Sequence, residues 1–136
     1  MKRNLHVTVM GLLVASTVLS GCSPLRLFGL RDFSEISRQN NTRIMTLQLG
    51  MTPEEVVEHI GPSGNSRVPN PVRGEVYPAG DDTFRAFFFY TGTGYVASIL
   101  DSDLMPVVFK NERLDDWRWS YWESTVTQYN IRIGNE

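Results

Sequence analysis

The hydrophobic periodicity of the chain changes at a loop rich in proline, glycine, serine and asparagine between Pro62 and Pro71. Before this loop the apolar residues follow a helical spacing, and after it they alternate as in strands. Helices followed by a run of strands are typical of an α+β domain. We therefore expect a two-helix hairpin packed on an antiparallel meander sheet of three to five strands.

The helical part is expected to hold two short helices. The first is predicted from Phe33 to Leu47, although the centre at residues 39–42 is a weak helix former. Gly50 then ends one element, and Thr52, Pro53 and Glu55 begin the next with an N-cap, a first-turn proline and a capping box. The second helix is predicted from Pro53 to Ile60, after a turn of two or three residues, with a buried face of Val56, Val57 and Ile60.

The second half is expected to form the sheet. The predicted strands cover residues 75–77, 84–91, 95–100, 105–110 and 114–122, with tight turns at 91–94 and 111–112. The tail at 127–133 also alternates polar and apolar residues. Residues 123–136 are therefore interpreted either as one more strand or as a mobile terminus.

The first 21 residues have the pattern of a secretory signal. Lys2 and Arg3 precede an apolar run that is shorter than the roughly 20 residues a membrane-spanning helix needs. Small residues then lead to the only cysteine of the chain in the order Leu19, Ser20, Gly21, Cys22. The expected organisation is a signal peptide at 1–21, a tether at 22–31 and one domain at 32–136.

This signal resembles that of bacterial lipoproteins. The resemblance implies a diacylglycerol on the Cys22 sulfur and an acyl chain such as palmitate on its amine. Three chains would hold the protein on a bilayer, since each buried methylene contributes about 0.8 kcal/mol. Because Ser23 and not an aspartate follows the cysteine, the resemblance further implies the outer membrane, facing the periplasm. The alternative is a cleaved secreted protein with a free thiol at Cys22.

Charge and composition narrow the class of partner. The chain has 13 basic and 15 acidic residues, and the acidic balance argues against a nucleic-acid partner. No metal-ligand set, cofactor motif or small-molecule site is evident. His59, Asp101-Ser102-Asp103 and the glycine-rich turn at 91–94 are interpreted as a surface histidine, a solvated turn and a hairpin turn.

The aromatic residues leave a second question open. If 114–122 is a strand, Trp117, Trp119 and Tyr121 share one face and Trp122 takes the other. The strand predicted at 84–91 divides in the same way: one face carries Phe84, Ala86, Phe88 and Tyr90, and the other carries Phe87 and Phe89. These aromatics are either mostly core or partly a surface for a protein partner. The candidate partner-binding residues are Trp117, Trp119, Tyr121 and Trp122.

Two segments carry a family resemblance. Residues 47–57 read Leu-Gln-Leu-Gly-Met-Thr-Pro-Glu-Glu-Val-Val and are followed by Ile60-Gly61-Pro62, while residues 106–117 contain a hairpin that leads into Trp117. Together they resemble small outer-membrane lipoproteins of the SmpA/OmlA-like superfamily, typified by the small lipoprotein subunit of the barrel-assembly machinery. The contiguous Gly61-Pro62 departs from the family's Gly-x-Pro, which is consistent with a separate, uncharacterised group within the superfamily.

The resemblance implies a lipid-anchored, non-enzymatic envelope protein that binds a protein partner in outer-membrane assembly or maintenance. The alternative is a periplasmic inhibitor or sensor that binds an enzyme or a cell-wall component, because a secreted β-lactamase inhibitor shares the same α/β shape.

Overall fold

The structure is a computed structural model that describes residues 31–133. The expected signal peptide, Cys22 and the tether up to residue 30 lie outside the described residues, as do residues 134–136. The elements, in chain order, are β1 (Arg31–Asp32), α2 (Ser34–Ile44), α3 (Pro53–Ile60), β2 (Arg73–Ala79), β3 (Asp82–Tyr90), β4 (Tyr95–Val96), a 3-10 turn (Asp101–Asp103), β5 (Leu104–Lys110), β6 (Arg113–Asp116) and α4 (Trp119–Gln128).

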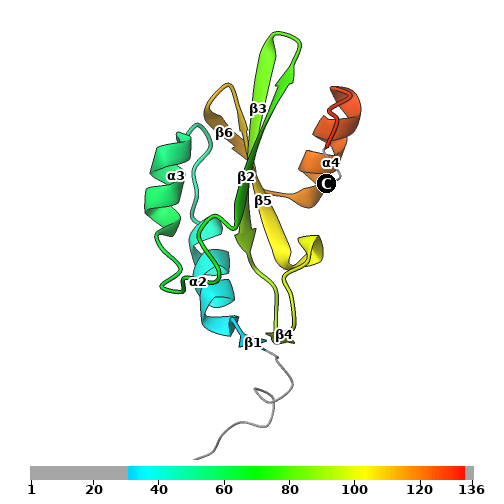
Figure 1. Cartoon of the computed structure of the whole chain (residues 1–136). Coiled ribbons are helices and arrows are strands. Elements are labelled where there is room, and N and C mark those ends of the chain that lie inside the picture. Colours follow the sequence, from blue (N-terminus) through cyan, green and yellow to red (C-terminus); the bar gives the residue numbers. More distant parts are fainter. Residues whose placement is uncertain (1–30, 134–136) are drawn as a thin grey trace, which may run out of the picture.

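The main sheet is an antiparallel meander in the order β2-β3-β5-β6, which confirms the predicted α+β class. A second, two-stranded sheet joins β1 to β4. In Figure 1, α2 and α3 lie on one side of the main sheet and α4 on the other, and the β2–β3 hairpin projects beyond the helices. The sheet is therefore the middle layer of the domain.

Each face of the main sheet carries a buried core, to both of which α2 and its flanking residues contribute, and β3 shows the alternation directly. The core on the α4 side contains Phe33, Ile36, Val68, Phe84, Ala86, Phe88, Tyr90, Leu104, Val108 and Trp122. The core on the α3 side contains Ile44, Leu47, Val56, Ile60, Phe89, Val107, Phe109 and Leu114. The predicted separation of Phe84, Ala86, Phe88 and Tyr90 from Phe87 and Phe89 is thus confirmed.

Helix α3 forms where its local signals placed it. Thr52 Oγ1 accepts from the Glu55 amide, and a Glu55 carboxylate oxygen accepts from the Thr52 amide at 2.8 Å, which completes the capping box. Gly50 has a φ of 85°, a conformation that glycine adopts without strain. Val56 and Ile60 are fully buried, while Val57 is only half-buried.

The connection between α2 and α3 is longer than the two or three residues expected. It runs over residues 45–52 because it also pairs with the sheet. The Gly50 amide donates to the Leu114 carbonyl at 2.8 Å, and the Leu114 amide donates to the Met51 carbonyl at 2.8 Å. The connection therefore covers the outer edge of β6.

The prediction of a strand from Leu114 to Trp122 is wrong beyond Asp116. The Asp116 carboxylate accepts from the Trp117 amide at 2.7 Å and pairs with Arg118, which turns the chain out of the strand. Residues Trp119, Trp122, Val126 and Tyr129 then follow a helical spacing, and all four pack into the α4-side core. This helical stripe competes with the alternation that had suggested a strand.

The tail is neither a strand nor a free terminus as far as Ile131. Helix α4 ends at Gln128 in a left-handed turn, with Asn130 at a φ of 50°. The Asn130 amide donates to Thr127 and the Ile131 amide to Val126 at 3.0 Å, the pattern of a Schellman cap. Ile131 also packs against the α4-side core, so the chain is held in place up to this residue.

Two other strands differ from expectation. The strand predicted at 95–100 is reduced to Tyr95–Val96, and it pairs with β1 and not with the main sheet. The strand predicted at 75–77 extends over Arg73–Ala79 and forms one edge of the main sheet.

Candidate interaction surface

The four aromatic residues predicted as a contact surface do not share one face. Trp122 is 2% exposed and packs between the rings of Tyr77 and Phe88. Trp119 is half-buried and its indole Nε1 donates to the Leu104 carbonyl at 2.7 Å. Tyr121 donates to the Asp115 carboxylate. Trp117 packs on the opposite, α3-side core.

The aromatic residues of 117–122 are therefore divided between the two sides of the sheet. Trp122 contributes packing and almost no surface. Of the other residues singled out from the sequence, Leu19, Ser20, Gly21 and Cys22 lie outside the described residues.

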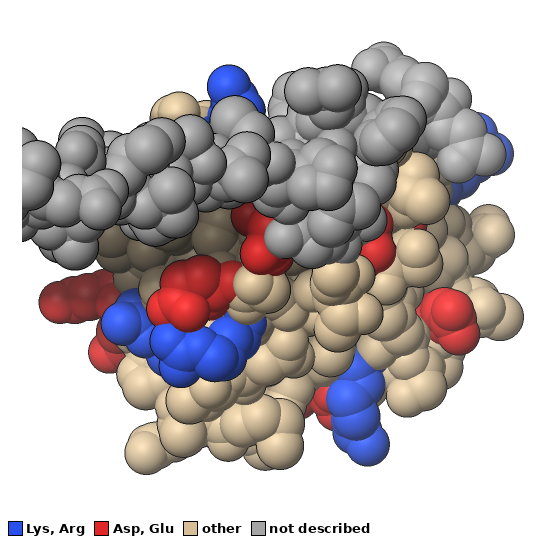
Figure 2. Space-filling view, turned by 90° about the horizontal axis from the view of Figure 1, so that it is seen from below, with Lys and Arg blue, Asp and Glu red and all other residues tan. Residues whose placement is uncertain are grey.

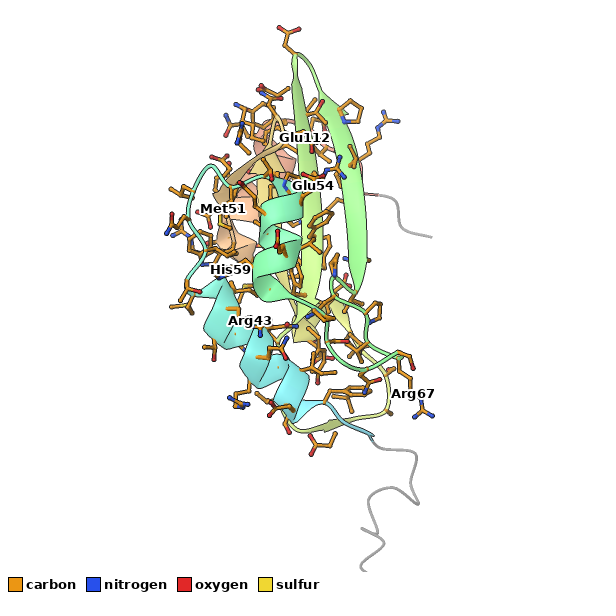
Figure 3. All side chains as sticks on the ribbon, turned by 90° about the vertical axis from the view of Figure 1, so that its left-hand side faces the viewer. Arg43, Met51, Glu54, His59, Arg67 and Glu112 are labelled. Carbon is orange, nitrogen blue, oxygen red and sulfur yellow. The ribbon has the colours of Figure 1, made fainter. Side chains whose placement is uncertain are left out.

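A shallow apolar groove lies instead between α3 and the sheet. It has a volume of about 340 Å³ and is lined by Pro53, Glu54, Val57, Glu58 and Phe87. Figure 3 shows Glu54 on the upper part of α3, next to the β2–β3 hairpin. The groove uses the part of the α3-side face that the helix leaves uncovered.

Strand β2 lies next to this groove, since it pairs with the part of β3 that carries Phe87. Gly74 pairs with Phe87 and Val76 with Arg85, so these residues of β2 share the α3-side face. Val76 is 52% exposed, and Gly74 is also exposed. A Cβ on Gly74 would lie 3.0 Å from the Phe87 ring, so only glycine leaves this ring unobstructed.

The outer edge of β2 presents main-chain groups. The Thr83 carbonyl accepts from the Asn111 amide of the β5–β6 turn. The main-chain N–H and C=O groups of the odd-numbered residues of β3 therefore point towards β5, and those of the even-numbered residues point towards β2. Tyr77 pairs with the even-numbered Phe84, so the main-chain groups of Tyr77 and of every second residue of β2 point towards β3. The main-chain groups of the residues between them, Gly74, Val76 and Pro78, therefore point away from β3. Among residues 31–133, no hydrogen bond joins this side of β2 to another segment.

The charge beside the groove is negative. Glu54 and Glu58 lie one helical turn apart, both exposed, and neither forms an ion pair within the described part of the chain. The nearby Arg85 is already paired with Glu112 at 3.1 Å. The groove thus combines an apolar floor with two carboxylates that a cation could neutralise.

The polar motifs singled out from the sequence have structural contacts. The exposed His59 lies 2.8 Å from Thr46 Oγ1. Asp101 pairs with Arg73 at 2.6 Å, and Asp103 accepts from the Leu100 amide at 2.9 Å, so the acidic triplet forms a 3-10 turn. Within residues 31–133, no three His, Cys, Asp or Glu side chains gather as metal ligands would.

Two half-buried phenols, Tyr77 and Tyr121, have strongly raised pKa values. Burial raises the pKa of Tyr77 to about 12, and its hydrogen bond to the Glu75 carboxylate acts in the same direction. Burial likewise raises the pKa of Tyr121 to about 12, with a further contribution from Asp115. Both carboxylates accept from a neutral phenol, so these pairs stabilise the fold and supply no reactive group at neutral pH.

The groove was missed at the sequence level, although part of its signal was present. Residues 75–77 were predicted as an edge strand, and Gly74 next to them marks a position where another backbone can approach closely. The contribution of Phe87 could not be foreseen, since it depends on where α3 crosses the sheet.

The end of the domain that carries β1 has mixed charge. Figure 2 views the molecule from this end, and basic and acidic side chains are interspersed over the part that is not drawn in grey. None of the helices in residues 31–133 has the length and apolar character to cross a bilayer.

Comparison with known proteins gives no relative: the chain matches no protein-family model, no curated protein and no solved structure.

Proposed function

We propose that the protein is a lipid-anchored, non-enzymatic envelope lipoprotein that binds a protein partner at the outer membrane, on the periplasmic side. The observation that carries this proposal is the sequence Leu19-Ser20-Gly21-Cys22, which ends a signal-like segment and contains the only cysteine. The anchor would be a diacylglycerol on the Cys22 sulfur and an acyl chain on its amine.

The position of the folded domain is compatible with such an anchor. The described domain begins at Arg31, so residues 23–30 connect it to Cys22. Fully extended, this segment reaches at most roughly 28 Å. The domain would therefore work close to the bilayer, and a partner would be another protein of the envelope.

The role in outer-membrane assembly or maintenance rests on the family resemblance at residues 47–62 and 106–117. The Gly50 turn and the Thr52 capping box of that signature form as the pattern predicts. These features are structural, so they support the fold and leave the partner to be found by experiment.

Replacement of the lipidated residue tests the anchor. Cys22→Ser should block lipidation and processing, so that a larger precursor accumulates and radiolabelled palmitate is no longer incorporated. The matched control is Ser23→Ala, which keeps the cysteine and should mature normally. A Cys22→Ser protein that matures and stays in the membrane, or a free Cys22 thiol found by mass spectrometry of the membrane-bound protein, would overturn the proposal.

Crosslinking in intact envelopes tests the class of partner. Recovery of barrel-assembly components supports a role in outer-membrane assembly. Recovery of a cell-wall enzyme instead supports the inhibitor or sensor alternative.

A further inference from the structure

We infer that the free edge of β2 and the groove beside α3 bind an extended segment of the partner, which joins the main sheet as a fifth strand. The segment would place apolar side chains beside Val76 and Gly74, and a lysine or arginine long enough to reach towards Glu54 and Glu58. This inference rests on the proposed partner-binding function and names the surface and the chemistry of the partner.

The two edges of the main sheet differ in a way that points to β2. The β6 edge is closed by main-chain hydrogen bonds to Gly50 and Met51. The β2 edge runs for seven residues without such a cover in the described chain. Exposed edges of this length are usually blocked by charge, bulges or proline, because they pair readily with other chains.

The blocking devices on β2 leave the α3-side face near Gly74 and Val76 free, because the charged Arg73 and Glu75 pair with each other on the α4-side face. Pro78 cannot donate a hydrogen bond, and it lies next to the hairpin turn. Gly74 and Val76 keep their outward amide and carbonyl groups, and neither side chain is charged. This half of the edge can therefore accept a strand, and main-chain hydrogen bonds would supply much of its affinity.

The groove beside this edge would read the side chains of the added strand. In a strand, every second side chain points to the same face. Side chains on the α3-side face would stand directly beside Val76 and Gly74, and only a long one would reach across Gly74 towards Phe87, about 10 Å away on β3. Since this lining is mainly apolar, valine-like residues fit it.

Charge decides between possible occupants. Glu54 and Glu58 have no ion pair within residues 31–133, so a cation on the incoming segment would neutralise them. A second copy of the chain would bring the same acidic helix to the interface. A basic and apolar segment of another protein is therefore the occupant that the groove favours.

The experiment titrates the full-length, 15N-labelled protein with a capped peptide of sequence Thr-Val-Thr-Val-Thr-Lys-Thr. Its valines and lysine share one face when it is extended. We expect saturable amide shifts centred on Gly74 and Val76, and slower hydrogen exchange of these two amides once they donate to the added strand. An analogue methylated at every backbone nitrogen should not bind, and an analogue with glutamate for lysine should bind about tenfold more weakly.

Matched variants test the location. Val76→Asp should weaken the binding of the peptide about tenfold or more, while Leu100→Asp, at an apolar residue of similar exposure outside the groove, should not. The double variant Glu54→Gln/Glu58→Gln should bind the peptide several-fold more weakly, and its affinity should no longer depend on salt concentration. Glu123→Gln, on the exposed surface of α4, is its control. Thermal melting of each variant verifies that the fold is kept.

Four outcomes would overturn the inference: no saturable binding of the peptide, shifts outside β2 and α3, equal binding of the methylated analogue, or a Val76→Asp variant that binds normally. Concentration-dependent shifts at Gly74 and Val76 without peptide would identify a second copy as the occupant and would also contradict it. The result is independent of the anchor, because a protein with an unmodified Cys22 can still show a functional groove, and a lipidated one can lack it.

Discussion

At the scale of single residues, burial separates aromatic side chains that the sequence presents alike. Trp122 is almost fully enclosed, whereas Trp117, Trp119 and Tyr121 are half-buried. Trp122 contacts two aromatic rings from different strands, Tyr77 of β2 and Phe88 of β3. It therefore joins α4 to the sheet.

Trp122→Ala should destabilise the domain strongly. Removing a buried aromatic ring loses its transfer free energy and leaves a cavity, so we expect the free energy of unfolding to fall by about 3–5 kcal/mol. Urea denaturation followed by circular dichroism measures it. Met45→Ala, at a side chain that is 76% exposed, is the control and should change stability by less than about 0.5 kcal/mol. A change in Trp122→Ala no larger than that of the control would mean that α4 does not pack on the sheet.

Asn40 shows why α2 forms although its central residues have low helix propensity. Its side chain is fully buried and donates to the Tyr90 carbonyl at 2.8 Å. It also exchanges hydrogen bonds with the amide of Asn70 at 2.7 and 3.0 Å. A residue of poor helix propensity is thus retained in α2 because tertiary hydrogen bonds more than offset the local cost.

At the scale of elements, locally encoded helices were predicted and context-dependent ones were not. The observed limits of α3, Pro53–Ile60, are those predicted, because its cap, first-turn proline and terminating glycine all lie within the helix or beside it. Helix α4 has no side-chain cap at Arg118. Its start depends on Asp116 turning the chain and on the α4-side core receiving the apolar stripe.

The capping box makes a prediction at this scale. Thr52→Ala removes the acceptor for the Glu55 amide, so we expect a loss of about 1 kcal/mol in the free energy of unfolding, within a range of about 0.5–2 kcal/mol. Chemical denaturation measures it against Thr93→Ala, which makes the same chemical change at an exposed turn. Equal stability of the two variants would show that the cap is not formed in solution.

At the scale of the whole molecule, the α4-side core couples the ionisation of tyrosine to folding. The pKa of Tyr77 is raised to about 12, and so is that of Tyr121, against about 10 in an unfolded chain. The folded state therefore holds these two protons more tightly. The resulting contribution to stability is fully present below about pH 10 and is lost as the pH rises towards 12.

An alkaline titration tests this coupling. The phenolate absorbance of the folded protein should show a late component near pH 12, which is absent in urea. Tyr77→Phe/Tyr121→Phe should reduce it and flatten the fall in stability above pH 10, leaving the contribution of the buried Tyr90, whose pKa burial also raises. A late component of unchanged size in the double variant would assign it to other groups.

The two faces of the sheet show what sequence alternation predicts and what only the tertiary structure reveals. Alternation along β3 predicted correctly which aromatic residues lie together on each face. It could not tell whether both faces are covered, because a core and a contact surface fit the same pattern. The Schellman cap at Asn130 and the stripe through Trp122 show that α4 covers the second face.

The sequence by itself determined that the first two helices precede the main sheet, the turn at Gly50 with the start of α3, and the two faces of β3, because each depends on neighbours within a few residues. It also supplied the lipoprotein-like pattern that ends at Cys22, on which the proposed anchor rests. Only the tertiary structure decided that 119–128 is a helix, that the β6 edge is covered and that the β2 edge faces an acidic groove. These features arise where segments far apart in the chain compete for the same apolar surface and the same main-chain hydrogen bonds, so no local pattern contains them.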